Sequence, residues 1–140
     1  MSNSNKMTVA DIMTSPVISV TMDTRFSDIR ELMEELKIHH MPVIDKDELV
    51  GIISDRDLLR ILSPYFGTAA EMQRDVESFN KVAHQIMTRQ PIYVKATDAV
   101  DVVLAWLQSV DISCVLVADE NKGLVGIVTW RDLLKHAKFG

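Results

Sequence analysis

Three things are scarce in this chain, and each scarcity excludes a class of protein. The single cysteine, Cys114, rules out an internal disulfide and a Cys-x-x-Cys metal or redox pair. No apolar run approaches the roughly 18 residues of a membrane span, and the start MSNSNKMTVADIM lacks the hydrophobic centre of a signal peptide. Basic residues are not in excess, because the net charge is −5, which argues against a nucleic-acid surface. We therefore expect a cytoplasmic protein that binds neither membrane nor nucleic acid.

Catalytic patterns are missing as well. The sequence contains no nucleophile with its base, no paired carboxylates in an apolar setting and no Walker-type glycine loop with lysine. The adjacent His39 and His40 would point to opposite sides of an extended segment, and no spaced Cys, His or carboxylate completes a metal-ligand set. We predict a protein that is not an enzyme and that needs neither a metal nor a cofactor.

The 140 residues, 47% of them hydrophobic, suffice for a compact core, and they contain an internal repeat. GIISDRDLLR (51–60) recurs as GIVTWRDLLK (126–135), with six of ten positions identical. Upstream, VADIMTSPVISV (9–20) matches VAHQIMTRQPIYV (82–94), and KIHHMPVIDKDELVGI (37–52) matches DISCVLVADENKGLVGI (111–127). This period is too long for a solenoid. It predicts two duplicated units at 8–62 and 82–138, joined by a linker helix region at 63–81.

Hydrophobic periodicity predicts the same elements in both units. In the first unit we expect a short helix ending at Met13, an extended segment at 17–20, a helix over 25–37 capped by Asp23 or Thr24, strands at 41–44 and 49–53, and a last helix beginning at 54–57 with Leu58, Leu59 and Leu62 facing inward. In the second unit we expect a helix over 98–110, strands at 114–117 and 124–129, and a last helix over 131–138.

Two further expectations concern helices. The linker is predicted to be helical from about Ala69 to His84, after breaks at Pro64 and Gly67. Trp106 shares the inward stripe of its helix with Val102, Val103 and Val110, so we predict that it is a core residue.

The stretch from about Val9 to Ala137 resembles a tandem pair of CBS domains, the cystathionine-beta-synthase module. The pattern that carries the resemblance is Gly, two apolar residues, Ser or Thr, two variable residues and Asp, found at 51–57 and again at 126–132. The resemblance implies an α/β (α+β) fold in which two β-α-β units, related by a pseudo-twofold, form one CBS pair, or Bateman module. It also implies a stand-alone bacterial-type protein, a homodimer, and adenosine nucleotides as ligands.

Each copy of the pattern offers a hydroxyl and a carboxylate at a strand-to-helix junction. Asp57 and Asp132 can accept hydrogen bonds from ribose hydroxyls, while Ser54 and Thr129 lie where backbone amides favour phosphate. The alternative is that Ser54 and Thr129 are plain helix N-caps and that the aspartates only complement the helix dipole.

The remainder of each site follows from the family arrangement, in which the opposite unit completes it. The resemblance implies two sets of ligand-binding residues: Thr129, Arg131 and Asp132 with Thr14, Val17, Ile38, His39 and His40; and Ser54, Arg56 and Asp57 with Thr88, Ile92, Ile112, Ser113 and Cys114. Arg56 and Arg131 have solvated or inter-subunit roles as alternatives. His39 and His40 are expected near the phosphates as donors that become cationic, whereas Asp55 would repel an anion beside Ser54, so the Asp132 site is predicted to bind first.

The function expected from these residues is that of a regulatory sensor of adenine nucleotides. AMP, ADP or ATP is the expected ligand, with S-adenosylmethionine and NAD as alternatives, and occupancy would reach an unknown protein target through a partner contact or the shape of the dimer. Two other functions stay open: a dimerisation scaffold that binds no ligand, and a regulatory subunit of a separately encoded enzyme or transporter. Cys114 is expected to be a small buried side chain rather than a reactive thiol.

Overall fold

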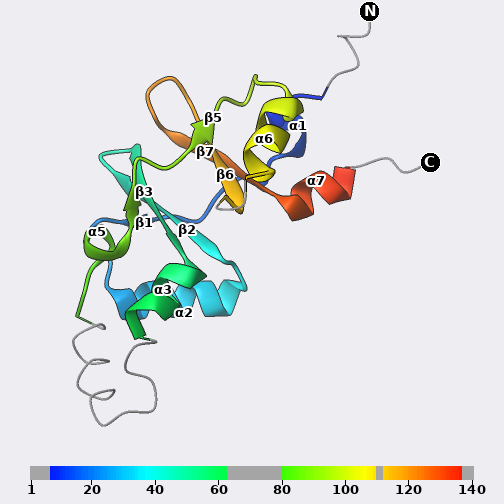
Figure 1. Ribbon diagram of the computed structural model, residues 1–140. Helices are drawn as coiled ribbons and strands as arrows, with labels where there is room; N and C mark the ends of the chain where they lie inside the picture. Colours follow the sequence, from blue (N-terminus) through cyan, green and yellow to red (C-terminus); the bar gives the residue numbers. More distant parts are fainter. Residues whose placement is uncertain (1–6, 63–79, 110–111, 137–140) are drawn as a thin grey trace, which may run out of the picture. The chain divides into compact units, whose positions relative to one another are not determined.

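The computed structural model describes residues 7–62, 80–109 and 112–136. These residues form short helices interspersed with strands (Figure 1). Their order is α1 (Val9–Ile12), β1 (Val20–Thr21), α2 (Phe26–Leu36), β2 (His40–Asp45), β3 (Glu48–Ser54), α3 (Asp55–Leu62), α5 (Ala83–Ile86), β4 (Thr88–Arg89), β5 (Tyr93–Val94), α6 (Val100–Leu107), β6 (Cys114–Ala118), β7 (Leu124–Thr129) and α7 (Trp130–His136).

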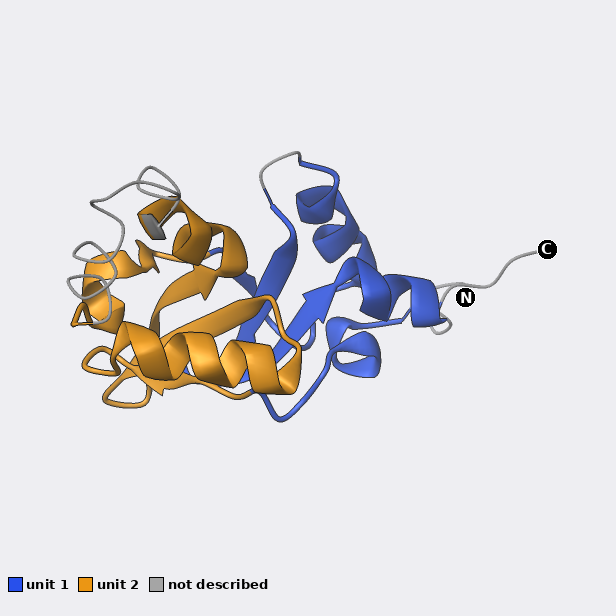
Figure 2. Ribbon diagram, turned by 90° about the horizontal axis from the view of Figure 1, so that it is seen from below, with its two compact units in different colours: residues 1–17, 92–140 blue, residues 18–91 orange. Residues whose placement is uncertain are grey.

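The chain forms two compact units whose boundaries differ from those of the sequence repeats. Unit 2 is the continuous stretch 18–91, whereas unit 1 combines residues 1–17 with residues 92–140 (Figure 2). The start of each repeat therefore packs with the sheet of the other repeat. Backbone pairing explains this exchange of the two segments 8–17 and 82–91. Thr14 bridges to Ile127, and Thr88 and Arg89 pair with Ile52 and Gly51.

Unit 2 contains a four-stranded sheet in the order β1-β2-β3-β4. Strands β1 and β2 are parallel and are connected through α2, which is the crossover that parallel pairing requires. Strands β2 and β3 form an antiparallel hairpin whose two turn residues, Lys46 and Asp47, have φ values of 50° and 66°. Positive φ at both positions is typical of a type I′ turn.

Unit 1 contains the equivalent sheet, β5-β6-β7. Strands β5 and β6 are parallel around α6, and β6 and β7 are antiparallel. Thr14 extends this sheet, because its amide donates to the carbonyl of Ile127 (2.8 Å) and its carbonyl accepts from the amide of Ile127 (3.1 Å). The α+β architecture of two β-α-β units is thus confirmed.

Each unit has its own apolar core, to which its crossover helix contributes. Helix α2 packs against β2, and α6 against β6. The buried residues that form the core cluster of unit 2 are Val20, Phe26, Ile29, Met33, Met41, Val43, Ile53, Leu58 and Ala83. Those of unit 1 are Val9, Ile12, Val94, Val103, Leu107, Val115, Val117 and Val128. Residues from the exchanged segments, Ala83 in unit 2 and Val9 and Ile12 in unit 1, are part of these cores.

The two repeated glycines lie where an exchanged segment crosses the sheet. A Cβ atom on Gly51 would meet the Sδ of Met87 and lie 3.1 Å from the carbonyl oxygen of Thr88. A Cβ atom on Gly126 would meet the Sδ of Met13 in the same way. Glycine at these positions therefore permits the close approach that joins each exchanged segment to its sheet.

Several expectations about helices are wrong. The N-cap of α2 is Arg25 and not Asp23 or Thr24, because the hydroxyl of Thr24 accepts the amide of Thr21 instead (3.1 Å). Leu59 is exposed on α3 while Leu58 faces the core, since the helix begins at Asp55 and presents a narrow apolar stripe. The side chain of Leu62 lies outside the described residues.

The expected core position of Trp106 is also wrong. Its side chain is 41% exposed, and Val102 is exposed on the same helix face, whereas Val103 and Leu107 are buried. Helix α6 is apolar on nearly all sides, so its sequence does not specify which stripe meets the sheet.

The expected linker helix over 69–84 is wrong at its end, because Asn80, Lys81 and Val82 are not helical. Val82 pairs as an isolated bridge with Arg25, and the helix α5 begins at Ala83. Residues 63–79, Val110, Asp111 and the predicted helix end at 137–138 lie outside the described residues.

Candidate ligand-binding site

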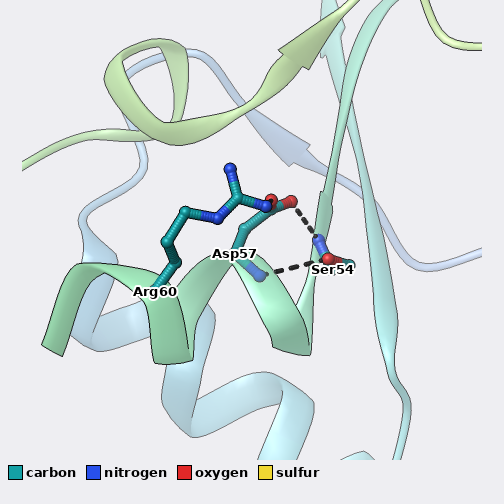
Figure 3. A network of polar contacts seen from close by, with 3 residues as sticks. All are labelled: Ser54, Asp57 and Arg60. Atoms are coloured by element: carbon teal, nitrogen blue, oxygen red, sulfur yellow. Dashed lines mark hydrogen bonds and ion pairs between the residues drawn. The ribbon is translucent and has the colours of Figure 1, made fainter. Parts of the chain in front are cut away.

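In unit 2, the end of β3 and the start of α3 fix the carboxylate of Asp57. The amide of Ser54 donates to Oδ2 of Asp57 (2.8 Å), and the amide of Asp57 donates to Oγ of Ser54 (3.2 Å). This reciprocal pair is a capping box, so Ser54 is the N-cap of α3 (Figure 3). Asp57 is 9% exposed, which makes its carboxylate a buried charged group with a fixed orientation.

Arg60, one turn further along α3, binds the second oxygen of this carboxylate. Its Nη2 lies 3.1 Å from Oδ1 of Asp57 (Figure 3). The side chain of Arg60 is 74% exposed, against 11% for Asp57, so the guanidinium reaches the buried carboxylate from the solvent side. The sequence analysis missed Arg60, although an Asp and an Arg spaced i, i+3 on a helix are a recognised pairing signal.

In unit 1, the equivalent carboxylate has different partners. The amide of Thr129 donates to Oδ2 of Asp132 (2.9 Å), and the Thr129 hydroxyl also lies within 3.4 Å of that oxygen. The second oxygen, Oδ1, accepts a hydrogen bond from the hydroxyl of Thr14 (2.8 Å). Thr14, from the first repeat, thus lies beside Asp132 of the second repeat, as the sequence predicts, and both belong to one compact unit.

The two histidines belong to unit 2, next to the Ser54 junction. Nδ1 of His39 lies 2.9 Å from Oδ2 of Asp55, and the amide of Asp55 donates to the carbonyl of His39 (3.0 Å). Both side chains of this pair are more than half exposed, so it is a surface ion pair when His39 is protonated. Asp55, which is expected to repel an anion beside Ser54, therefore has His39 as its partner.

His40 pairs with Ser54 across β2 and β3. Burial lowers the pKa of His40 below its usual value, the positive charges of His39 and Arg56 lower it further, and the carboxylates of Asp55 and Asp57 oppose the shift. His40 is therefore a neutral imidazole beside the junction at physiological pH.

The other expected site residues are distributed over both units. In unit 1, Cys114 pairs with Thr129 across β6 and β7, and the carbonyl of Ile92 accepts the amide of Leu116 (3.3 Å). In unit 2, Thr88 pairs with Ile52 on β4. Val17, Ile38, Ile92 and Ile112 are half-buried, while Ser113, Arg56 and Arg131 are exposed. The completion of each site by residues of the other unit stays a prediction.

Cys114 is buried, and burial raises the pKa of its thiol to about 12. It is therefore an inert thiol at neutral pH, in agreement with the sequence-based expectation. Among the described residues, no three His, Cys, Asp or Glu side chains gather in a way that could hold a metal ion. Within the same residues, no helix is long and apolar enough to cross a membrane.

Comparison with known proteins places this arrangement in a family. The CBS domain family matches residues 9–64 and 82–138, which are the two repeats, so the chain belongs to the CBS domain family. CBSX2 from Arabidopsis thaliana is 30% identical with a TM-score of 0.80, and the match covers 94% of each chain. CBSX2 has also been solved in complex with AMP, and that structure is 29% identical, with a TM-score of 0.77 over 92% of this chain and 94% of the other.

A third solved structure is the CBS domain pair of protein MJ0100 in complex with 5′-methylthioadenosine and S-adenosyl-L-methionine. It is 27% identical with a TM-score of 0.77, over 93% of this chain and 94% of the other. Among curated relatives, a CBS domain-containing protein of Dictyostelium discoideum is 29% identical over 92% of this chain and 90% of its own length.

Other curated relatives are much longer than this chain. A homoserine O-acetyltransferase of Methanobrevibacter ruminantium is 26% identical over 91% of this chain, but the match covers only 23% of the enzyme. The chain spans from 23% to 46% of the length of the first four curated relatives that it matches.

Proposed function

We propose that this chain is a regulatory module that binds an adenosine-containing ligand. The observation that carries the proposal is the pair of carboxylates, Asp57 and Asp132, each fixed through Oδ2 by a backbone amide of a Ser or Thr three residues earlier. A carboxylate held in one orientation can accept hydrogen bonds from both hydroxyls of a ribose, since each oxygen has two acceptor sites. The capping role of Ser54 and Thr129 is compatible with this, because it supplies the fixed orientation.

The relatives support the ligand class. One CBS pair with 29% identity is known with AMP, and another with 27% identity is known with 5′-methylthioadenosine and S-adenosyl-L-methionine. The ligands share the adenosine group and differ at the 5′ position. We propose AMP, ADP or ATP for this chain, with S-adenosylmethionine and NAD as the alternatives, and no metal, nucleic acid or membrane as partner.

Regulation requires that the ligand bind two states of the module with different affinities. We propose that occupancy changes a contact with a protein target in the cytoplasm, and that the module itself performs no reaction. Two relatives favour different settings for the module. The match covers 90% of a CBS domain-containing protein, which favours a free sensor, and 23% of an enzyme, which favours a regulatory part of an enzyme. Copurification from the source cell distinguishes a free sensor from a regulatory subunit.

We also propose that the module is a homodimer. Helix α6 exposes Val102, Leu104 and Trp106, and α2 exposes Leu36 at its end. Burying such side chains is favourable by about 25 cal/mol per Å² of apolar surface. A dimerisation scaffold without ligand is the competing function, and ligand titration separates the two.

The test is a thermal-shift and calorimetric series with AMP, ADP, ATP, S-adenosylmethionine, NAD and, as a control for the base, GMP. A ligand at about 100 times its Kd stabilises the folded state by roughly 2.7 kcal/mol, which gives a measurable rise in Tm. We expect a rise with at least one adenine ligand and none with GMP. The double variant Asp57→Asn, Asp132→Asn should be folded and lose the response. No response of the folded wild-type protein to any of these ligands at 1 mM would leave the scaffold as the better function.

A further inference from the structure

The two equivalent carboxylates differ in what binds their second oxygen. Oδ1 of Asp57 accepts from the guanidinium of Arg60 at 3.1 Å, whereas Oδ1 of Asp132 accepts from the hydroxyl of Thr14 at 2.8 Å. In the second repeat the position of Arg60 is occupied by Lys135, whose side chain is exposed, and no described hydrogen bond or ion pair joins Lys135 to Asp132. The guanidinium contact is therefore particular to the first repeat.

The chemistry of these two donors is unequal towards a ribose. An arginine guanidinium can only donate, so Arg60 and a ribose hydroxyl both seek the same acceptor, Oδ1 of Asp57. A threonine hydroxyl donates and also accepts, so Thr14 can turn to accept from a ribose hydroxyl that binds Asp132. Both bonds are charge-assisted, because the acceptor in each is a carboxylate, so the difference lies in whether the donor can also accept.

The hydroxyls of Ser54 and Thr129 also differ, and this difference too makes the Asp132 carboxylate the easier one for a ligand to reach. Oγ of Ser54 accepts from the amide of Asp57 (3.2 Å) and completes a closed capping box. The Thr129 hydroxyl instead faces Oδ2 of Asp132 at 3.4 Å, a long contact that is readily exchanged. Asp57 is buried, while Asp132 is half-buried, so the Asp132 carboxylate is also the more accessible of the two.

We propose that Arg60 is a specificity-determining residue that holds the Asp57 carboxylate closed, so that one chain binds its adenosine ligand mainly at Asp132. The inference rests on the proposed function. Binding at Asp57 requires the ligand to displace or share Arg60, and we expect at least a tenfold weaker Kd there than at Asp132. Removal of Arg60 should open the Asp57 site.

The experiment uses isothermal titration calorimetry with two probes, AMP and the uncharged 5′-methylthioadenosine, on the full chain. The variant Asp132→Asn leaves Asp57 as the remaining carboxylate, and Arg60→Ala is then added to it. We expect Asp132→Asn to lose most binding, and the double variant to recover at least tenfold in Kd with both probes. Arg60→Lys, which restores a cationic donor, should return the weak binding, and the matched control Lys135→Ala should leave the wild-type isotherm unchanged.

The uncharged probe separates two roles of Arg60. If Arg60 instead binds the phosphate of AMP, Arg60→Ala should weaken the binding of AMP and leave the binding of 5′-methylthioadenosine unaffected. That result overturns the proposal. Equal Kd values for Asp57→Asn, which keeps the Asp132 site, and Asp132→Asn, which keeps the Asp57 site, also overturn it. Absence of binding of either probe to folded wild-type protein instead contradicts the proposed function itself. Circular dichroism of each variant confirms that a lost isotherm is not a lost fold.

Discussion

Thr14 and Asp132 are 118 positions apart in the sequence, and the Thr14 hydroxyl donates a 2.8 Å hydrogen bond to Oδ1 of Asp132. This bond, together with the backbone pairing of Thr14 and Ile127, attaches the first described segment of the chain to the last strand and helix. In unit 2, the equivalent Thr88 pairs with Ile52, and no hydrogen bond within the described residues links its side chain to Asp57. The two threonines thus differ in side-chain role while their backbones are equivalent.

This difference predicts unequal effects of two matched substitutions. Thr14→Val should lower the free energy of unfolding by about 0.5 to 1.5 kcal/mol, since it removes the hydrogen bond to Asp132. Thr88→Val is the control and should change it by less than about 0.5 kcal/mol, as is usual for an exposed position. Urea unfolding followed by circular dichroism measures both. Equal losses at the two positions would mean that the side-chain bond contributes nothing.

The close contacts of Gly126 predict that a larger side chain at this position lowers the free energy of unfolding. Gly126→Ala should destabilise unit 1 by about 1 to 3 kcal/mol, because the new Cβ meets the Sδ of Met13. Combining it with Met13→Ala should recover part of that loss, since the opposing atoms are gone, and a double-mutant cycle measures the coupling. A cycle with no coupling, within about 0.3 kcal/mol, contradicts the close approach.

Burial of Cys114 predicts both its reactivity and a pH dependence. The thiol should react with a thiol reagent at pH 8 only after the protein is unfolded, because its pKa is raised to about 12. From pH 9 to pH 12 the unfolded chain loses this proton while the folded chain keeps it. Stability attributable to the thiol is therefore full below pH 9 and falls as pH rises, by roughly 1 kcal/mol per pH unit.

The control for this prediction is Cys114→Ala, which lacks the thiol. Its stability should fall less steeply between pH 9 and pH 12 than that of the wild type. Rapid labelling of the native protein at pH 8 would show that the thiol is accessible.

His40 predicts a loss of stability on the acid side. Its pKa is lowered chiefly by burial, so the folded state favours the neutral imidazole. The stability that this shift supplies is present above the unfolded pKa of 6.5 and is lost as pH falls below it. His40→Gln should make unfolding midpoints less sensitive to pH between 6.5 and 5. Identical pH profiles for wild type and His40→Gln are the contrary result.

The exposed face of α6 predicts how the module assembles. Trp106→Glu should convert the proposed dimer to a monomer, because it places a charge beside Val102 on the exposed face of α6. Light scattering at micromolar concentration measures the mass, and circular dichroism should show an unchanged fold since the side chain is not in the core. Leu134→Glu, on the exposed side of α7, is the comparison. A wild-type monomer mass at these concentrations removes the dimer from the proposal.

The sequence predicted elements whose signal is local. Strand 124–129 has the expected bounds, and the hairpin of β2 and β3 follows from two apolar runs separated by a charged turn. Helix faces were less predictable where apolar residues surround the axis, which is why Trp106 was misplaced. Leu59 failed for a similar reason, because its hydrophobicity equals that of Leu58 and only Leu58 lies on the side of α3 that meets the core.

The site residues divide along the same line. Ser54, Asp57, Thr129 and Asp132 follow from a repeated local pattern, and the structure gives each pair a direct hydrogen bond. The contact between Thr14 and Asp132 depends on which sheet the first segment joins, so the repeat alone does not predict it, and the family resemblance placed the two residues in one site. Arg60 carried a readable signal, the i, i+3 spacing to Asp57, that was overlooked.

The exchanged segments also determine the sequence in which the two units can fold while the chain is being synthesised. Residues 18–91 contain all of unit 2, so this unit can assemble as soon as that continuous stretch has left the ribosome. Unit 1 can form only after residues 92–140 have been made. Its assembly then brings these residues together with the earlier segment 1–17, which adds the entropic cost of closing a long loop. Until then, Val9 and Ile12 have no sheet to cover, and the newly made chain presents them to solvent and to chaperones.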